Sequence, residues 1–158
     1  METDSLIQEF PDKAARRKHI LQNQLYGIAL DPVCQLMTAR TVYGTINGQS
    51  NIKLIDKYTD IIKNKDRKYF KEALKEKFGQ MEFDVVIGNP PYQENIASSD
   101  GNKSLSKQLF PAFIINAVNM ADIVAMITPS RWFTGEAQDG SFPKLRQFFR
   151  ENNHIIYI

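Results

Sequence analysis

The stretch Phe83-Asp-Val-Val-Ile-Gly-Asn-Pro-Pro-Tyr92 decides the fold of this chain. Its first six residues form a short apolar run, which predicts a buried strand over 83–88. The two prolines end that strand, because proline cannot donate to a strand ladder. In open α/β sheets, ligands bind at the carboxyl ends of the strands. The pattern therefore places the amide of Asn89, the carbonyl of Pro90 and the ring of Tyr92 where chemistry is expected.

Strand and helix signals alternate along the rest of the chain. Short apolar runs predict strands over 25–30, 52–55, 123–127 and 154–158; helical spacing and cap signals predict helices over 11–23, 31–43, 65–78, 104–120 and 141–152. The helix over 104–120 should bend near Pro111. Such an order is typical of an α/β fold with a doubly wound parallel sheet.

The length of 158 residues predicts a single domain. Within it, residues 1–24 should form a helical lead-in with a frayed start, and the polar residues 93–104 a mobile loop beside the Asn-Pro-Pro-Tyr motif.

Composition excludes several classes of protein. Hydrophobic residues make up 42% of the chain, which suits a globular core, and the net charge of +2 permits a nucleic-acid partner without arguing for one. Cys34 is the only cysteine, so an internal disulfide or a cysteine zinc cluster is excluded and a cytoplasmic location is expected. His19 and His154 give no metal spacing, and no metal site is expected. No apolar run has the length of a membrane span.

The motif FDVVIGNPPY resembles the catalytic motif of the amino-methyltransferases, in particular the N6-adenine DNA methyltransferases of restriction-modification systems with the gamma-type motif order. The resemblance implies methyl transfer from S-adenosylmethionine to N6 of an adenine flipped out of double-stranded DNA. The Asn89 side-chain oxygen and the Pro90 carbonyl would accept the two N–H groups of the exocyclic amine, and Tyr92 would stack on the base. Both acceptors precede a proline, which restricts their backbone and preorganises them.

The resemblance extends over roughly residues 15–158 and implies a cofactor site in a partial Rossmann-like methyltransferase sheet. Leu30 would pack on the adenine of the cofactor, Asp31 matches an acidic position near its ribose, and Asp56 would accept from its amino group. Phe113 would cover the other face of that adenine. Each assignment has a structural alternative: Asp31 is well placed to cap the helix that follows, Asp56 to cap a turn, and Phe113 to pack in the core.

The chain also departs from the family's pattern. Ala29 stands where an acidic residue usually binds the ribose, and the glycine-rich motif Asp-x-x-x-Gly-x-Gly is absent. These departures favour an internal piece of a larger methyltransferase, lacking the first strand and the C-terminal strands and inactive by itself. Strands 25–30 and 83–88 would then expose unpaired edges, which predicts self-association of the fragment.

Several alternatives stay open at this stage. The segment Pro129-Ser-Arg-Trp-Phe133 matches one that the family carries after its fifth strand, and Arg131 and Trp132 could either meet DNA or pack on the sheet. The tetrapeptide also serves methylation of an amide or amine of protein or RNA. A third possibility is a non-catalytic remnant that binds DNA or a partner subunit.

Overall fold

The computed structural model describes residues 4–29, 31–44, 50–54, 67–79, 82–96 and 105–152. The chain divides into two compact units. The first unit comprises Met1–Tyr58 with Leu74–Gly79, and the second comprises Thr59–Ala73 with Gln80–Ile158. The predicted strand over 154–158 lies outside the described residues, as do Leu30 and Asp56.

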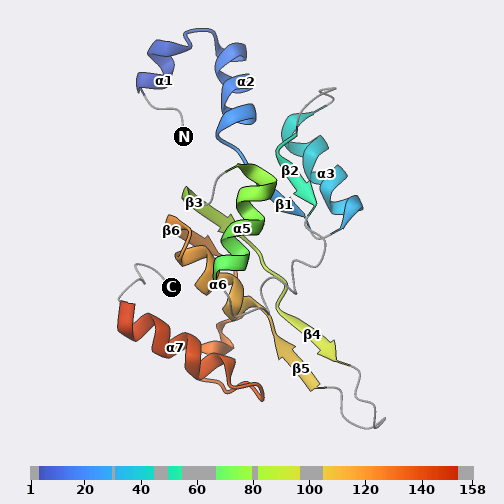
Figure 1. Ribbon diagram of the computed structural model, residues 1–158, viewed down its shortest axis with the longest axis vertical. Coiled ribbons are helices and arrows are strands. Elements are labelled where there is room, and N and C mark those ends of the chain that lie inside the picture. Colours follow the sequence, from blue (N-terminus) through green and yellow to red (C-terminus); the bar gives the residue numbers. More distant parts are fainter. Residues whose placement is uncertain are drawn as a thin grey trace. The chain divides into compact units, whose positions relative to one another are not determined.

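The first unit carries a parallel strand pair with helices before and between the strands (Figure 1). Its elements are α1 (Asp4–Glu9), α2 (Lys13–Asn23), β1 (Gly27–Ala29), α3 (Pro32–Tyr43) and β2 (Ile52–Leu54). Strands β1 and β2 pair in parallel with Gly27 opposite Ile52. Residues 4–9, which the sequence predicted to be frayed, form α1, and the Leu6 side chain is buried.

Helix α3 begins where the sequence predicts. Asp31 is its N-cap, accepting a hydrogen bond from the Cys34 backbone N–H at 2.9 Å, and Pro32 occupies the first turn. At the other end the buried hydroxyl of Tyr43 donates to the Leu21 carbonyl at 2.9 Å and accepts from the Asn51 N–H at 3.2 Å. Tyr43 therefore joins α3 to the segments that precede β1 and β2.

Helix α5 (Arg67–Phe78) confirms the predicted charged helix over 65–78. Leu74 is fully buried, and the Phe78 ring meets the Tyr26 ring edge to face at a centroid distance of 5.6 Å. Gly79 follows with a φ of 75°, the left-handed conformation that glycine adopts at the ends of helices.

The second unit contains a parallel pair and an antiparallel hairpin (Figure 1). Its elements are β3 (Phe83–Gly88), β4 (Gln93–Ile96), β5 (Leu105–Gln108), α6 (Phe110–Val118), β6 (Ala121–Met126), the 3-10 turn η1 (Ser130–Trp132) and α7 (Ser141–Asn152). Strand β3 pairs in parallel with β6, with Val85 opposite Ile123, and α6 connects the hairpin to β6. Among the described residues the strands form three two-stranded sheets, so the α/β class with parallel pairs is confirmed, whereas one continuous sheet is not seen.

Two predictions for the segments that follow the motif are wrong. Residues 105–108 form β5 instead of the start of a helix over 104–120, and Pro111 lies in the first turn of α6 instead of bending it. A proline is tolerated there because the first turn has no intrahelical acceptor for its missing N–H. Residues 93–96 form β4, antiparallel to β5, so this part of the loop predicted over 93–104 is a strand; residues 97–104 lie outside the described part.

The expected burial of the strands over 83–88 and 123–127 is also wrong. One face of the β3–β6 pair is exposed: Val85 is 43% exposed, Ile87 77% and Ile123 57%. These three side chains alternate with residues of the opposite face, where Met126 packs against the core. A run that is apolar on both faces predicts burial on both faces, but burial also needs an element to cover each face.

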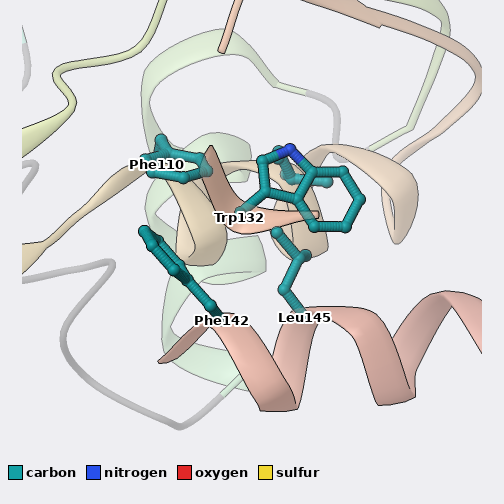
Figure 2. Packing of buried hydrophobic residues seen from close by; sticks show 5 residues of the cluster. Phe110, Trp132, Phe142 and Leu145 are labelled. Carbon is teal, nitrogen blue, oxygen red and sulfur yellow. The ribbon is translucent and has the colours of Figure 1, made fainter. Parts of the chain in front are cut away.

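The core of the second unit gathers around aromatic side chains (Figure 2). Phe110 from α6, Trp132 from η1, and Phe142 and Leu145 from α7 are each 5% exposed or less. Their rings and the Leu145 side chain face one another between the three elements (Figure 2). This core lies directly beneath the segment that follows β5 and holds the elements around the motif in place.

Candidate functional site

The motif Asn89-Pro-Pro-Tyr92 crosses from the carboxyl end of β3 to the start of β4, and backbone hydrogen bonds fix it at both ends. The Gly88 carbonyl accepts from the Ile127 N–H at 2.9 Å, and the Tyr92 carbonyl accepts from the Leu109 N–H at 3.0 Å. The motif is therefore tied to the carboxyl end of β6 on one side and to the start of α6 on the other.

The Asn89 amide and the Pro90 carbonyl are not used by the described part of the chain. Asn89 is exposed, and its side-chain amide makes no hydrogen bond with any described residue. The ring of Pro90 is buried, while its carbonyl accepts no hydrogen bond within the described part of the chain. An amide oxygen and a carbonyl on a backbone that two prolines restrict can both accept from a substrate N–H.

Tyr92 contacts the ring of Phe110 and is partly exposed to solvent. Its side chain is 39% exposed. The ring meets the fully buried Phe110 ring at a centroid distance of 6.5 Å and an interplanar angle of 83°. Edge-to-face contact of this kind is a favoured geometry for aromatic pairs. Tyr92 thus combines a fixed edge with exposed ring surface, as a stacking residue requires.

Arg131 and Trp132, in the segment after β6, have different environments, which the sequence did not predict. Trp132 is 5% exposed and packs in the core of the second unit, so its role is structural. Arg131 is exposed, and its Nη2 donates to Gln108 Oε1 at 2.6 Å and to Gln93 Oε1 at 3.2 Å. Its guanidinium carbon lies 5.7 Å from the centroid of the Phe142 ring. Gln93 and Gln108 are direct partners in the β4–β5 ladder.

Asp139 joins this segment to the hairpin. Its Oδ2 accepts from the Gln108 backbone N–H at 2.9 Å, and its Oδ1 accepts from the Ser141 backbone N–H at 3.0 Å. Burial opposes ionisation of Asp139, but the hydrogen bonds from Ser141 and Gln108, with the nearby Lys107 charge, outweigh that effect and hold its pKa below the usual range. The ionised carboxylate therefore links β5 to the start of α7.

The residues expected at the cofactor divide between the two units. Asp31 lies in the first unit and caps α3, and the hydrogen bonds from the Cys34 side chain and backbone lower the pKa of its carboxyl. The same contact raises the pKa of the exposed Cys34 thiol. Phe113 lies on α6 in the second unit with Asn89, Pro90 and Tyr92, and it is 7% exposed. Leu30 and Asp56 lie outside the described residues.

The position expected to bind the ribose does not fit that role. Ala29 is 5% exposed and packs with Tyr43 and Ile52 in the core of the first unit. It offers no acceptor, and a carboxylate at this place would be buried among apolar side chains. Among the described residues Asp31 is the one predicted cofactor carboxylate, and its Oδ1 already serves the helix cap.

The described residues carry neither a metal site nor a membrane-spanning helix. No group of three or more histidine, cysteine, aspartate or glutamate side chains there could hold a metal ion. None of the described helices has the length and apolar character needed to cross a membrane.

The sequence did not single out Gln93 and Gln108, which bind Arg131, or Asp139, which binds the Gln108 backbone. A hairpin signal was present, since a run rich in serine, glycine and asparagine separates two short segments. Reading that signal would have placed Gln93 opposite Gln108, but the contact with Arg131 joins residues far apart in the chain and leaves no local pattern.

Comparison with known proteins shows the family of the chain. The Eco57I restriction-modification methylase family matches residues 23–158. The chain belongs to this family. It is also 27% identical over 206 residues to a Mycoplasma pneumoniae protein described as an uncharacterized adenine-specific methylase, an alignment that covers 95% of this chain and 48% of the relative. The chain thus spans about half the length of the curated relative it matches. No solved structure matches.

Membership of the Eco57I-type methylase family is consistent with the expectation drawn from Asn89-Pro-Pro-Tyr92. The family match takes in β3, the motif, α6 and the Arg131 segment, so the site described above lies wholly inside it. Methylation in a restriction-modification setting is the class of activity that the family indicates.

Proposed function

We propose that the intact gene product methylates N6 of adenine in DNA, with S-adenosylmethionine as methyl donor. The observation that carries the proposal is the exposure and hydrogen bonding of the motif at the carboxyl end of β3. Asn89 and the Pro90 carbonyl are acceptors that the described residues leave unused, and Tyr92 is partly exposed beside them. The match to the Eco57I-type family supports the same reaction class.

Asn89 and Pro90 act on the nucleophile. The lone pair of the exocyclic amine of adenine is delocalised into the ring, which makes the nitrogen a poor nucleophile. Acceptors that take both N–H hydrogens favour a tetrahedral nitrogen and return electron density to it. As the N–C bond forms, positive charge develops on this nitrogen, and the same two oxygens stabilise that charge. The bound cofactor supplies an electrophilic methyl group.

Tyr92 holds the base. A base in a duplex cannot reach the end of β3, so the adenine must be flipped out. The exposed surface of the Tyr92 ring would stack on it, while the contact with Phe110 keeps the tyrosine from turning away. Positioning of this kind converts an encounter into an in-line displacement without a covalent intermediate.

The test is methyl transfer to unmethylated double-stranded DNA, with the digested nucleosides analysed for N6-methyl-2′-deoxyadenosine. Asn89→Ala should lower the single-turnover rate on the order of 10²–10³-fold, the loss typical of one oxyanion-type contact, with little change in DNA affinity. Tyr92→Phe is the matched control, since it keeps the ring. A full-rate Asn89→Ala enzyme contradicts the role assigned to the amide. Transfer of the methyl group to RNA or protein but not to DNA contradicts the proposed substrate.

A second candidate is a DNA- or subunit-binding protein without catalysis, and the buried Ala29 is the observation that favours it. A charge-assisted hydrogen bond to the ribose would be missing, and such a bond is worth about 1.5–3 kcal/mol. DNA binding by the intact gene product, without cofactor binding or methyl transfer, supports this candidate over the first.

A further inference from the structure

Arg131 carries an exposed positive charge close to the motif. Its Nη2 donates a hydrogen bond to the side chain of Gln93, the residue that follows Tyr92. Both acceptors of Nη2 are neutral amide oxygens, so neither contact neutralises the arginine. Among the described residues no carboxylate pairs with Arg131.

Part of the guanidinium is left for a ligand. Arginine has five N–H donors, and the two hydrogen bonds to the glutamines both use Nη2. Nη1 and Nε have no acceptor within the described part of the chain. Both parallel donor pairs of a guanidinium include Nη2, so Nη1 and Nε are left to make single charge-assisted hydrogen bonds to phosphate oxygens.

The side chain is also held in place before any ligand arrives. The two glutamines fix one end of the guanidinium, and the buried Phe142 lies beneath it at 5.7 Å. Binding therefore costs less side-chain entropy than it would for an arginine that moves freely in solvent. If the side chain only linked the two glutamines, a neutral donor could bind both amide oxygens, and the positive charge of arginine would have no role.

We infer that Arg131 binds a backbone phosphate next to the flipped adenine. The inference rests on the proposed function, because a flipped base stays covalently joined to its sugar and phosphates. A base stacked on Tyr92 has its own phosphates within about one nucleotide of that ring. The exposed donors of Arg131 lie next to Gln93, the residue that follows Tyr92. Gln93 and Gln108 are positioning residues that hold the guanidinium, and Arg131 supplies the charge.

Salt dependence separates a phosphate contact from a purely structural tether. Each phosphate contact adds about 0.9 to the slope of log affinity against log salt concentration. Arg131→Gln should reduce that slope by about one. The loss of DNA affinity should accordingly be about tenfold at low salt and fall by a factor of about 3.5 when the salt concentration is raised fourfold. Arg131→Lys keeps the charge and should retain the wild-type slope.

The experiment titrates the intact gene product with unmethylated duplex DNA at several salt concentrations. Arg150→Gln, at an exposed position in the last turn of α7, is the control for loss of one charge elsewhere and should leave the slope unchanged. Equal slopes for wild type and Arg131→Gln overturn the inference, as does a loss of affinity that is the same at every salt concentration. Methylation of DNA by the wild type is measured in parallel. If the wild type methylates DNA while Arg131→Gln keeps its slope, only the inference fails; if the wild type neither binds nor methylates DNA, the proposed function fails with it.

Discussion

The ring of Tyr92 stands edge to face on the ring of Phe110, with the centroids 6.5 Å apart and the planes at 83°. Phe110 is fully buried at the start of α6, so the orientation of the partly exposed tyrosine depends on the core beneath it. The residue proposed to touch the substrate is thereby positioned by one that never reaches solvent.

Tyr92→Ala should lose the stacking of the base, which is worth roughly 1–3 kcal/mol, or about five- to 150-fold in productive binding. Tyr92→Phe keeps both the stacking surface and the edge contact with Phe110, so its effect should be mild. Single-turnover methylation rates over a range of DNA concentrations measure both. A large loss in Tyr92→Phe would instead assign a role to the hydroxyl and contradict stacking as the main contribution.

Asp139 makes the stability of the second unit dependent on pH. Its carboxylate accepts from Gln108 and Ser141, and its pKa is lowered in the folded state. A lowered pKa means that the unfolded chain binds a proton more readily, so the contribution is full above the unfolded pKa of about 3.9 and is lost as the pH falls through the folded pKa. The free energy of unfolding should therefore decrease in this acidic range.

Asp139→Asn tests that dependence by urea unfolding at several pH values. The asparagine keeps one acceptor oxygen and leaves one N–H without its partner, which costs about 1 kcal/mol at neutral pH. The difference from the wild type should shrink as the pH falls from the unfolded pKa of about 3.9 through the lowered pKa of the folded protein. Asp122→Asn removes a carboxylate at an exposed position of β6 and should change stability less. A difference that is constant with pH contradicts the prediction.

Gly135 lies against the backbone of Arg131, and a side chain has no room there. A Cβ at Gly135 would stand 2.5 Å from the Arg131 carbonyl oxygen, whereas one at Gly140 would meet nothing within 4 Å. Gly135→Asn should lower the free energy of unfolding by about 1–3 kcal/mol, the usual cost of overpacking. Gly140→Asn should be milder, because asparagine tolerates the left-handed φ of 66°. Equal losses in thermal unfolding would show that the close approach to Arg131 is unimportant.

Local signals in the sequence were sufficient for several elements. The β-branched run before Pro90 gave the bounds of β3 as the structure has them, and Asp31-Pro32 gave the start of α3. Gly79 marked the end of α5 in the same way. In each case a proline, a cap or a left-handed glycine acts on its immediate neighbours, so the determinant lies within the segment itself.

The features that could not be predicted from the sequence depend on tertiary contacts. Strand β5 is short and polar, and it is stabilised by pairing with β4 across residues 97–104, so its own composition carries little signal. The position of the Arg131 side chain depends on its hydrogen bonds to the two glutamines of that hairpin, so its own segment did not predict it. The exposed face of β3 and β6 could not be foreseen, because apolar character does not say which element covers it.

The absence of an acceptor at Ala29 predicts weak cofactor binding by residues 1–158. Ala29 is buried with Tyr43 and Ile52, and the neighbouring Asp31 uses its Oδ1 to cap α3. Loss of one charge-assisted hydrogen bond costs about 1.5–3 kcal/mol, which is about tenfold or more in affinity. Calorimetric titration with S-adenosylmethionine should therefore give no binding or binding weaker than micromolar, and a micromolar dissociation constant would falsify this prediction.

The last prediction concerns self-association of the 158-residue chain. Val85, Ile87 and Ile123 lie on one face of the β3–β6 pair and are each at least 43% exposed. Parallel strands usually have both faces covered, and a contiguous apolar face favours association. Within the second unit β3 pairs with β6, and these three side chains stay exposed in that pair. The net charge of +2 provides little repulsion between copies.

A second copy covering this face should make the apparent mass rise with concentration in sedimentation experiments. Ile87→Lys places a charge at the most exposed of the three side chains and should shift the equilibrium toward the monomer. Val33→Lys is the matched control, since Val33 is an equally apolar and 66% exposed residue on α3 in the other unit. A wild-type monomer at high micromolar concentration rules out self-association. If Val33→Lys dissociates the oligomer and Ile87→Lys does not, the contact lies on α3 and the sheet face is uninvolved.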